Sequence, residues 1–219
     1  MRRRSAPLLM ALALAGCVSV PDVRNLQIVD DGALLRSGQP TPLGLAELRD
    51  RYGVRMVINL DRGTSDDEMV VALALGLDYL AIPTATYGLE RENLVTLLAA
   101  LRQAERDGRT PVLVHCRSGQ DRTGAAVAVF RTIEEDWSAE DAEAEMQRYR
   151  HWTHEILFPH LPDIAEEAEH FKAHWEEAIQ RTGTVPVIRP PMRWMGTDDP
   201  AAGVARQSGV TVNAEPGVR

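Results

Sequence analysis

The sequence is poor in the features that mark several common protein classes. Its 219 residues include only two cysteines, which excludes a disulfide-rich secreted scaffold. It has no basic excess: 24 lysines and arginines face 32 acidic residues, so the formal charge of −8 argues against a nucleic-acid-binding protein. It also lacks an apolar run of the roughly 20 residues needed to cross a bilayer. With 44% hydrophobic and 26% charged residues, the remaining class is a globular domain.

The first 17 residues have the pattern of an export signal. Three arginines at positions 2–4 precede an apolar stretch, Ala6 to Ala15, and Leu14-Ala15-Gly16-Cys17 closes the segment. This closing set resembles the lipobox of bacterial lipoproteins. The resemblance implies that residues 1–16 are removed, that Cys17 is acylated, and that the protein resides in the cell envelope, at the outer membrane or in the periplasm if the organism is Gram-negative. The alternative is an ordinary secretory signal in which the cysteine is incidental.

Removal of the signal would leave an acidic chain with a single thiol. Because residues 1–16 hold three arginines and no acid, the mature charge would be −11 rather than −8. The membrane link would then be the lipid on Cys17 and not a basic patch. Cys116 would be the only free thiol, and an exported protein rarely retains one without a use for it.

Strand-like and helix-like segments alternate over residues 25–183. Apolar runs such as Met56–Leu60 predict buried parallel strands, and the alternation predicts an α/β domain whose mainly parallel sheet is flanked by helices. Residues 17–24 are interpreted as a tether. Residues 184–219, with five prolines and four glycines, are predicted to be a disordered tail. We expect strands on both sides of a turn at 30–32 and at 56–60, 79–82 and 111–115, and helices at 42–52, 65–75, 90–106, 124–135, from 138 onward and at 162–181.

The stretch His115–Gly124, HCRSGQDRTG, joins a buried strand to an apolar helix. In such a loop the backbone N–H groups converge at a helix N-terminus, where the helix dipole favours a tetrahedral oxyanion. Arg122 would add a planar fork of donors. Cys116 lies next to this positive field and is expected to favour its thiolate form, while Gly119 stands where a tight loop needs a positive φ. An anion cradle combined with a thiolate predicts nucleophilic attack on phosphorus.

This stretch resembles the signature of cysteine-dependent protein tyrosine and dual-specificity phosphatases, in which a histidine and the cysteine are followed by five residues, an arginine and a threonine. The segments Leu35–Pro40, Val57–Leu60 and Trp137–Met146 are similar to bacterial and atypical dual-specificity members. The resemblance covers about residues 25–150. It implies a phosphate-binding loop (P-loop) between strand and helix and a cysteinyl-phosphate intermediate that requires no metal or organic cofactor.

The resemblance assigns roles within this loop. Cys116 would be the nucleophile, Arg122 would clamp the phosphoryl group in the transition state, and Thr123 would assist thiolate departure in the second step. His115 would help to maintain the thiolate. The expected phosphate-binding residues are Arg117, Ser118, Gly119, Gln120, Asp121 and Arg122.

The sequence departs from the family pattern at the general acid. The family usually draws this proton from an aspartate on a loop before the signature, but the matching loop, 83–88, contains no acid. Asp121 is the preferred candidate, because some bacterial relatives with a similar loop place the acid there; its alternative role is a hydrogen bond that orients the loop. The other candidates are Asp61, Asp78, Glu90 and Glu92.

The predicted function is that of an exported phosphomonoester hydrolase acting on a phosphorylated protein or a small phosphomonoester, with no nucleic-acid partner. Three alternatives stay open. One is a catalytically weak pseudophosphatase that binds phosphorylated ligands. Another is an inositol phosphate or phosphoinositide phosphatase, suggested by Arg117 at the pocket rim. The last is sulfur transfer or arsenate reduction by the single thiol.

The last predicted helix carries one further pattern. His170 and His174 have the i, i+4 spacing of zinc ligands, but the acid-rich segment around them favours a solvated face, so no metal is expected. The aromatic residues near this end of the chain are predicted core contacts: Trp152, Phe158, Phe171 and Trp175.

Overall fold

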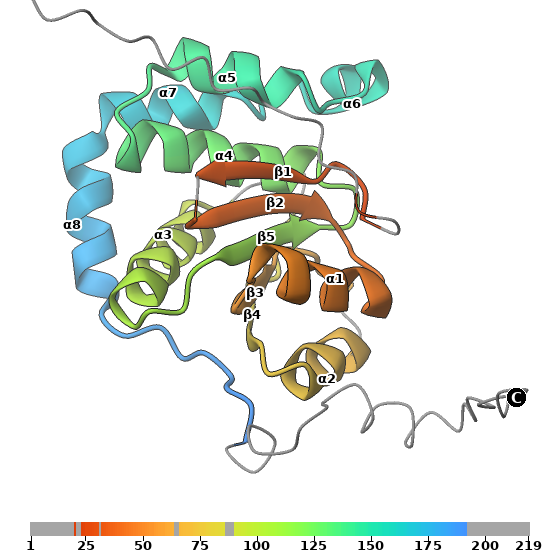
Figure 1. Ribbon diagram of the computed structural model, residues 1–219. Helices are drawn as coiled ribbons and strands as arrows, with labels where there is room; N and C mark the ends of the chain where they lie inside the picture. The colour runs from red at the N-terminus through yellow and green to blue at the C-terminus, as the bar shows by residue number, and fades with distance from the viewer. Residues whose placement is uncertain (1–19, 21–22, 31, 64–65, 86–89, 192–219) are drawn as a thin grey trace, which may run out of the picture.

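The structure, a computed structural model, describes residues 20, 23–30, 32–63, 66–85 and 90–191 (Figure 1). Its centre is a five-stranded sheet in the order β1-β2-β5-β3-β4. Every neighbouring pair is parallel except β1 with β2, so the predicted mainly parallel α/β sheet is confirmed. The strands are β1 (Gln27–Asp30), β2 (Leu34–Gly38), β3 (Met56–Asn59), β4 (Asp78–Ala81) and β5 (Val112–Cys116).

Helices cover both faces of the sheet (Figure 1). One face packs against α1 (Pro42–Tyr52) and α2 (Asp66–Ala74) through a core that includes Leu48 and Leu113. The other face packs against α3 (Arg91–Arg106) and α4 (Asp121–Glu134). The remaining helices are α5 (Ala139–Gln147), α6 (Trp152–Leu157), α7 (Asp163–His170) and α8 (Lys172–Thr182).

Local capping explains where several helices begin and end. The Thr41 side chain accepts a hydrogen bond from the backbone N–H of Gly44 at 3.1 Å, and Gly53 ends α1 with a φ of 69°. Ser138 caps α5 in the same way, accepting from the N–H of Asp141 at 3.1 Å. These caps are sequence-local, which is why the sequence predicts both helices closely.

The predicted helix at 162–181 is wrong in one respect, because the chain forms two helices that meet at Phe171. That residue leaves the helical conformation with φ −112° and ψ 28°. The break lets α7 bury Ala165 and Ala168 beside α4 and lets α8 turn along α3, where Trp175 is fully buried (Figure 1). Two further differences are that α4 begins at Asp121, three residues before the predicted start, and that α6 was not predicted.

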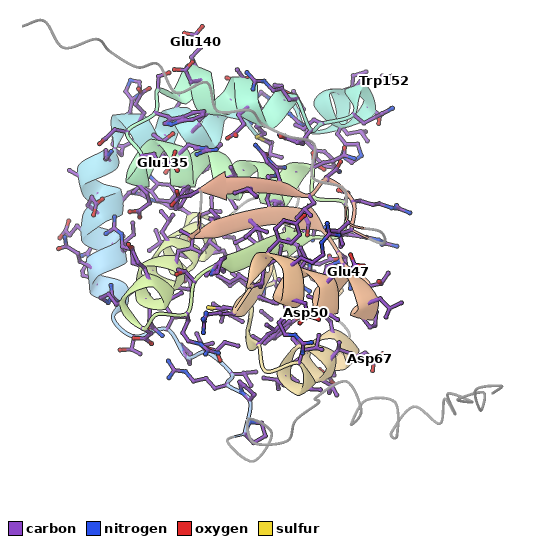
Figure 2. All side chains as sticks on the ribbon, in the orientation of Figure 1. Glu47, Asp50, Asp67, Glu135, Glu140 and Trp152 are labelled. Atoms are coloured by element: carbon purple, nitrogen blue, oxygen red, sulfur yellow. The ribbon has the colours of Figure 1, made fainter. Side chains whose placement is uncertain are left out.

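The outer aromatic residues differ from expectation. Trp152 and Phe171 are 63% and 51% exposed, so the prediction that they are core contacts is wrong; Figure 2 shows Trp152 on the outside of α6. Trp175 is buried as predicted, and Phe158 packs partly buried against Met146 and Leu161. Trp152 and Phe171 lie in short helices or at a helix junction, where a single side chain can face solvent without loss of the core.

The ordered domain extends beyond the predicted boundaries at both ends. Val20 and Val23 are buried and form an isolated β-bridge, so the expected tether is in part packed on the domain. Val185 is 3% exposed, and Ile188 pairs with Tyr79 at the edge of the sheet, so the predicted tail begins too early at 184. The signal segment, Cys17 and residues 192–219 lie outside the described residues. Within the described ranges, no helix combines the length and apolarity that a membrane span requires.

Candidate active site

The predicted P-loop occupies residues 117–120, between the end of β5 at Cys116 and the start of α4 at Asp121. Gly119 has a φ of 75°, which confirms the predicted left-handed position. A Cβ atom placed there would lie 2.5 Å from the backbone N of Gly38 and 2.6 Å from the carbonyl carbon of Ser37. The loop therefore packs directly on the end of β2, and glycine is required both for the backbone conformation and for the close approach.

Hydrogen bonds from the N-terminal segment orient the loop. The carbonyl of Arg117 accepts from the backbone N–H of Gln39 at 3.2 Å, and the carbonyl of Ser118 accepts from the side-chain amide of Asn25 at 2.8 Å. Asn25 precedes β1 and Gln39 follows β2, so these two bonds hold the loop carbonyls against the N-terminal segment, beside the N-terminus of α4. A loop in this position, directly before a helix N-terminus, is suited to hold an anion.

Cys116 lies at the base of this cradle. Its side chain is 1% exposed, and its Sγ accepts a hydrogen bond from the backbone N–H of Gly119 at 3.3 Å. Thr123, in the first turn of α4, is fully buried, and its hydroxyl has no hydrogen-bond partner among the described residues. This hydroxyl is therefore available to a group that arrives in the cradle, which fits the role implied by the family resemblance.

His115 belongs to a buried polar network behind the loop. Its Nδ1 lies 3.4 Å from the carbonyl oxygen of Cys116, and its Nε2 lies 3.2 Å from Oε1 of Glu68. Glu68 also accepts hydrogen bonds from the Asn59 amide and from the Tyr79 hydroxyl, the latter at 2.9 Å. Burial would raise the pKa of Glu68, but its contacts with His115, Tyr79 and Asn59 hold it below the ordinary value. An ionised carboxylate thus supports the histidine next to the thiol.

Glu68 is a site residue that the sequence reasoning missed. It lies on α2, far from the signature in sequence, and it is 7% exposed. A signal was present, because Glu68 is four residues before Ala72 and so shares the buried face of that helix. A carboxylate in the apolar stripe of a helix needs a buried polar partner.

Arg122 and Asp61 form an ion pair at the mouth of the cradle. Arg122 Nη1 donates to Asp61 Oδ1 at 2.7 Å, and the two side chains are 12% and 14% exposed. The same Nη1 lies 3.4 Å from the carbonyl oxygens of Leu60 and Thr84. Burial would raise the pKa of Asp61, but the hydrogen bond and charge of Arg122 hold it below the ordinary value. The structure thus brings a carboxylate to the arginine expected to bind phosphate.

The side chain of Asp121 binds residues on α6 and in the segment just before it. Its Oδ1 accepts from Arg150 Nε at 3.3 Å, and its Oδ2 lies 2.6 Å from His154 Nδ1. The neighbouring Gln120 side chain accepts from the backbone N–H of His151 at 3.0 Å. Asp121 is 5% exposed. These contacts fasten α6 to the P-loop and match the alternative role of an orienting hydrogen bond.

The other predicted acid candidates lie at different places. Asp78 starts β4 at the amino ends of the strands, away from Cys116, and it is paired with Arg109 at 2.7 Å. Glu90 is an exposed residue before α3, 3.9 Å from Arg62. Part of the loop 83–88 lies outside the described residues.

The described part of the chain contains no group of three or more His, Cys, Asp and Glu side chains arranged to hold a metal ion. His170 and His174 lie on different helices, α7 and α8, and both are exposed. The spacing that suggested zinc ligands therefore does not place them on one helical face. The site is built from a thiol, an arginine and backbone N–H groups.

Comparisons with known proteins identify the family of this chain. Residues 23–153 match the family described as "Swiss Army Knife protein, DSP-PTPase phosphatase domain". Dual specificity protein phosphatase TpbA of Pseudomonas aeruginosa strain UCBPP-PA14 is 31% identical over 115 residues, which cover 52% of this chain and 50% of TpbA. The chain thus matches about half the length of this curated relative.

Solved structures show the same fold. The crystal structure of P. aeruginosa TpbA is 24% identical, with a TM-score of 0.59, and the match covers 76% of this chain and 95% of that chain. The core catalytic domain of the PP-IP phosphatase SIW14 from S. cerevisiae is 20% identical, with a TM-score of 0.57 and coverage of 72% and 97%. Because the family match spans more than half of the sequence and includes the whole P-loop, the chain belongs to the DSP-PTPase phosphatase domain family.

Proposed function

We propose that this protein is a phosphomonoester hydrolase that acts through a cysteinyl-phosphate intermediate on Cys116. The observation that carries the proposal is the position of the Cys116 Sγ, which accepts a hydrogen bond from the Gly119 N–H within the loop that leads into the N-terminus of α4. The N–H groups and the Arg122 guanidinium suit the three equatorial oxygens of a phosphoryl group in transfer. The single free thiol of the described chain is the nucleophile.

In the first step, the substrate phosphate enters the cradle and displaces Asp61 as the ion-pair partner of Arg122. The Cys116 thiolate attacks phosphorus, so that an S–P bond forms while the bond from phosphorus to the leaving oxygen breaks. The leaving oxygen needs a proton unless it is a stable phenolate.

In the second step, water attacks the phosphorus of the intermediate, and the S–P bond breaks with its electron pair returning to sulfur. The buried Thr123 hydroxyl, which has no other partner among the described residues, donates a hydrogen bond to the departing thiolate. A carboxylate accepts the proton of the attacking water. Inorganic phosphate is the product, and Cys116 is restored.

We propose Asp61 as the carboxylate that moves these protons. In the free protein its pKa is held down by Arg122, so it is ionised. When a phosphate dianion occupies Arg122, Asp61 loses its cation and faces a negative charge, which raises its pKa and favours protonation. Asp121, the candidate preferred from the sequence, has both oxygens engaged by Arg150 and His154.

For the substrate, we propose a phosphorylated protein side chain, with small phosphomonoesters as the alternative. A crystal structure of a TpbA variant is described as a complex with pTyr; that structure is 24% identical, with a TM-score of 0.52. The exposed rim residue Arg117 would meet the negative charges that flank a phosphorylated residue. We also propose export and lipid attachment at Cys17, on the strength of the Leu14-Ala15-Gly16-Cys17 set.

The test is a turnover assay on the purified chain with a panel of phosphotyrosine, phosphoserine and phosphothreonine peptides, an aryl phosphate and inositol phosphates. Acid quenching during turnover should trap phosphate on Cys116, and mass spectrometry would detect it as an added mass of about 80 Da, that of HPO₃. Retained turnover in Cys116→Ser would refute the mechanism. Phosphate binding without any turnover would instead support the pseudophosphatase alternative.

The anchoring proposal is tested separately by the intact mass of the protein extracted from membranes. Cleavage before Cys17 with added acyl chains is expected. A mass that shows cleavage without acyl chains would refute it.

A further inference from the structure

A completely buried arginine lies beneath the P-loop. Arg36, the third residue of β2, has an exposed fraction of 0%. Its Nη2 donates to the carbonyl oxygen of Gly119 at 2.5 Å, and its guanidinium carbon lies 4.3 Å from the centre of the Tyr149 ring. The guanidinium is therefore enclosed between the loop, the sheet and the chain that follows α5.

Among the described residues, Arg36 forms no ion pair or hydrogen bond with a carboxylate; its hydrogen bond goes to the Gly119 carbonyl. Its Nε and Nη1 have no hydrogen-bond partner among the described residues. Other buried arginines are paired: Arg131 binds Glu145 at 3.0 Å, and Arg150 binds Asp121 at 3.3 Å. Burying a guanidinium without a counter-charge is costly, so such a residue needs an anion nearby.

One carboxylate and one thiol act on Arg36, those of Glu145 and Cys116. Glu145 is already paired with Arg131 at 3.0 Å, so the Cys116 thiolate is the anion that the site itself can supply. In the parallel register of β2 and β5, Arg36 is opposite Val114 and Gly38 is opposite Cys116, so Arg36 and Cys116 lie on the same face of adjacent strands. Strand spacing and rise place their Cα atoms about 8 Å apart. Burial lowers the pKa of Arg36; the nearby acidic groups of Tyr149, Glu145 and Cys116 oppose that effect, and the charge of Arg131 adds to it.

We propose that Arg36 is a positioning residue that supplies the buried counter-charge of the P-loop. It fixes the loop through the Gly119 carbonyl and stabilises the negative charge on Cys116, and then on the bound phosphoryl group, from below. Arg122 binds the phosphate from the mouth of the cradle, so the anion lies between two guanidinium groups. The proposal rests on the proposed role of Cys116 as nucleophile.

A rival account gives Arg36 a packing role only, in which its hydrogen bond to Gly119 maintains the shape of the loop. The two accounts differ in one measurable property. A counter-charge changes how readily Cys116 ionises, whereas a packing residue changes stability and loop geometry alone. The decisive readout is therefore the pH dependence of thiolate formation.

The first test is the rate of Cys116 alkylation by iodoacetamide as a function of pH, in chains that carry Cys17→Ser so that one thiol remains. Arg36→Gln should shift the midpoint of that profile upward by about one pH unit, because the thiolate loses a nearby cation. Arg102→Met is the matched control: Arg102 is paired with Glu134 and Glu176 away from the loop, and the midpoint should stay in place. An unchanged midpoint in folded Arg36→Gln would overturn the proposal.

The second test uses Arg36→Lys and does not depend on the folding of Arg36→Gln. A buried ammonium loses its proton far more readily than a guanidinium, and burial lowers a lysine pKa from about 10.4 by as much as several units. The kcat/KM profile of Arg36→Lys should therefore show an additional decline between about pH 8 and 10, on top of any basic limb of the parent profile. A profile that matches the parent profile over this pH range would overturn the proposal.

These outcomes are separable from failure of the proposed function. The alkylation profile reports the thiol directly and needs no turnover. If the parent chain shows no phosphatase activity but Arg36→Gln still shifts the alkylation midpoint, the counter-charge assignment stands and the hydrolase proposal falls. If turnover is normal and neither variant changes its pH profile, Arg36 is a packing residue.

Discussion

Replacing Asp61 by asparagine should have opposite effects on phosphate binding and on catalysis. In the free protein, Asp61 Oδ1 lies 2.7 Å from Arg122 Nη1, so an incoming phosphate must displace it. Both side chains are partly screened by solvent, with exposures of 14% and 12%, and such a pair contributes on the order of 1 kcal/mol. Asp61→Asn should therefore bind phosphate or vanadate about fivefold more tightly, because 1.4 kcal/mol corresponds to tenfold in affinity.

The same variant should be slow with poor leaving groups. Loss of a general acid costs on the order of 10²–10⁴ in rate, and the loss falls mainly on alkyl phosphates, whose alkoxide needs a proton. Aryl phosphates with acidic phenols should lose much less. The descending basic limb of the kcat profile should also disappear in Asp61→Asn, since that limb reports deprotonation of the acid. The assay is kcat across a series of leaving groups, with vanadate inhibition as the binding measure.

Asp121→Asn is the matched control on the neighbouring carboxylate. It breaks the contacts with Arg150 and His154, so we expect a loss of stability of roughly 1–3 kcal/mol and an equal slowing of good and poor leaving groups. If Asp61→Asn slows all leaving groups equally while Asp121→Asn discriminates among them, the reasoning is refuted. Asp121 would then be the acid, as the sequence-based hypothesis has it.

Four further substitutions test the cradle and its support. Cys116→Ser should abolish turnover but retain vanadate binding by calorimetry, whereas Arg122→Ala should lose both, because the cradle is made by backbone and guanidinium groups rather than by sulfur. Gly119→Ala places the Cβ of a left-handed alanine 2.5 Å from the backbone at the end of β2. Its thermal midpoint should fall well below that of the control Gly32→Ala, where φ is 84° but the space around the residue is open. Equal losses in the two variants would contradict the close approach. The pKa of Glu68 is lowered from its ordinary value of 4.5, so the ionised carboxylate stabilises the folded protein. In thermal melts recorded from pH 3 to 7, the stability advantage of the parent over Glu68→Gln should be complete above about pH 4.5 and decrease as the pH falls further. An advantage that grows on acidification would contradict the proposed network around Glu68.

The features that the sequence predicted well are those encoded by neighbouring residues. The strand, loop and helix around Cys116 are contiguous, and the need for glycine at position 119 follows from the tightness of that one loop. The helix caps at Thr41 and Ser138 are equally local. The predicted parallel sheet follows from the alternation of strands and helices, which fixes the class of fold without fixing the strand order.

The features that the sequence missed depend on distant residues. The partner of His115 is Glu68, 47 positions away, and Arg150 binds Asp121 from 29 positions away. No glycine or proline in the sequence marks the helix break at Phe171. The break arises because the segments on its two sides pack against different helices. The packing of Val185 against the domain likewise depends on Gln103, whose side chain bonds its backbone from 82 positions away.

The choice between the two carboxylates shows how helix geometry overrides proximity in sequence. Asp121 is adjacent to Arg122, but consecutive residues of an α-helix point about 100° apart. When Arg122 faces the cradle, Asp121 is turned toward α6 and the segment before it, where Arg150 and His154 bind its carboxylate. Asp61 is far from the signature in sequence, yet it follows β3, the neighbour of β5 in the sheet. Because the carboxyl ends of adjacent parallel strands meet at one edge, the fold brings Asp61 to Arg122. The sequence offers Asp61 as one candidate among several, and the strand order, which the sequence leaves open, is what distinguishes it from the others.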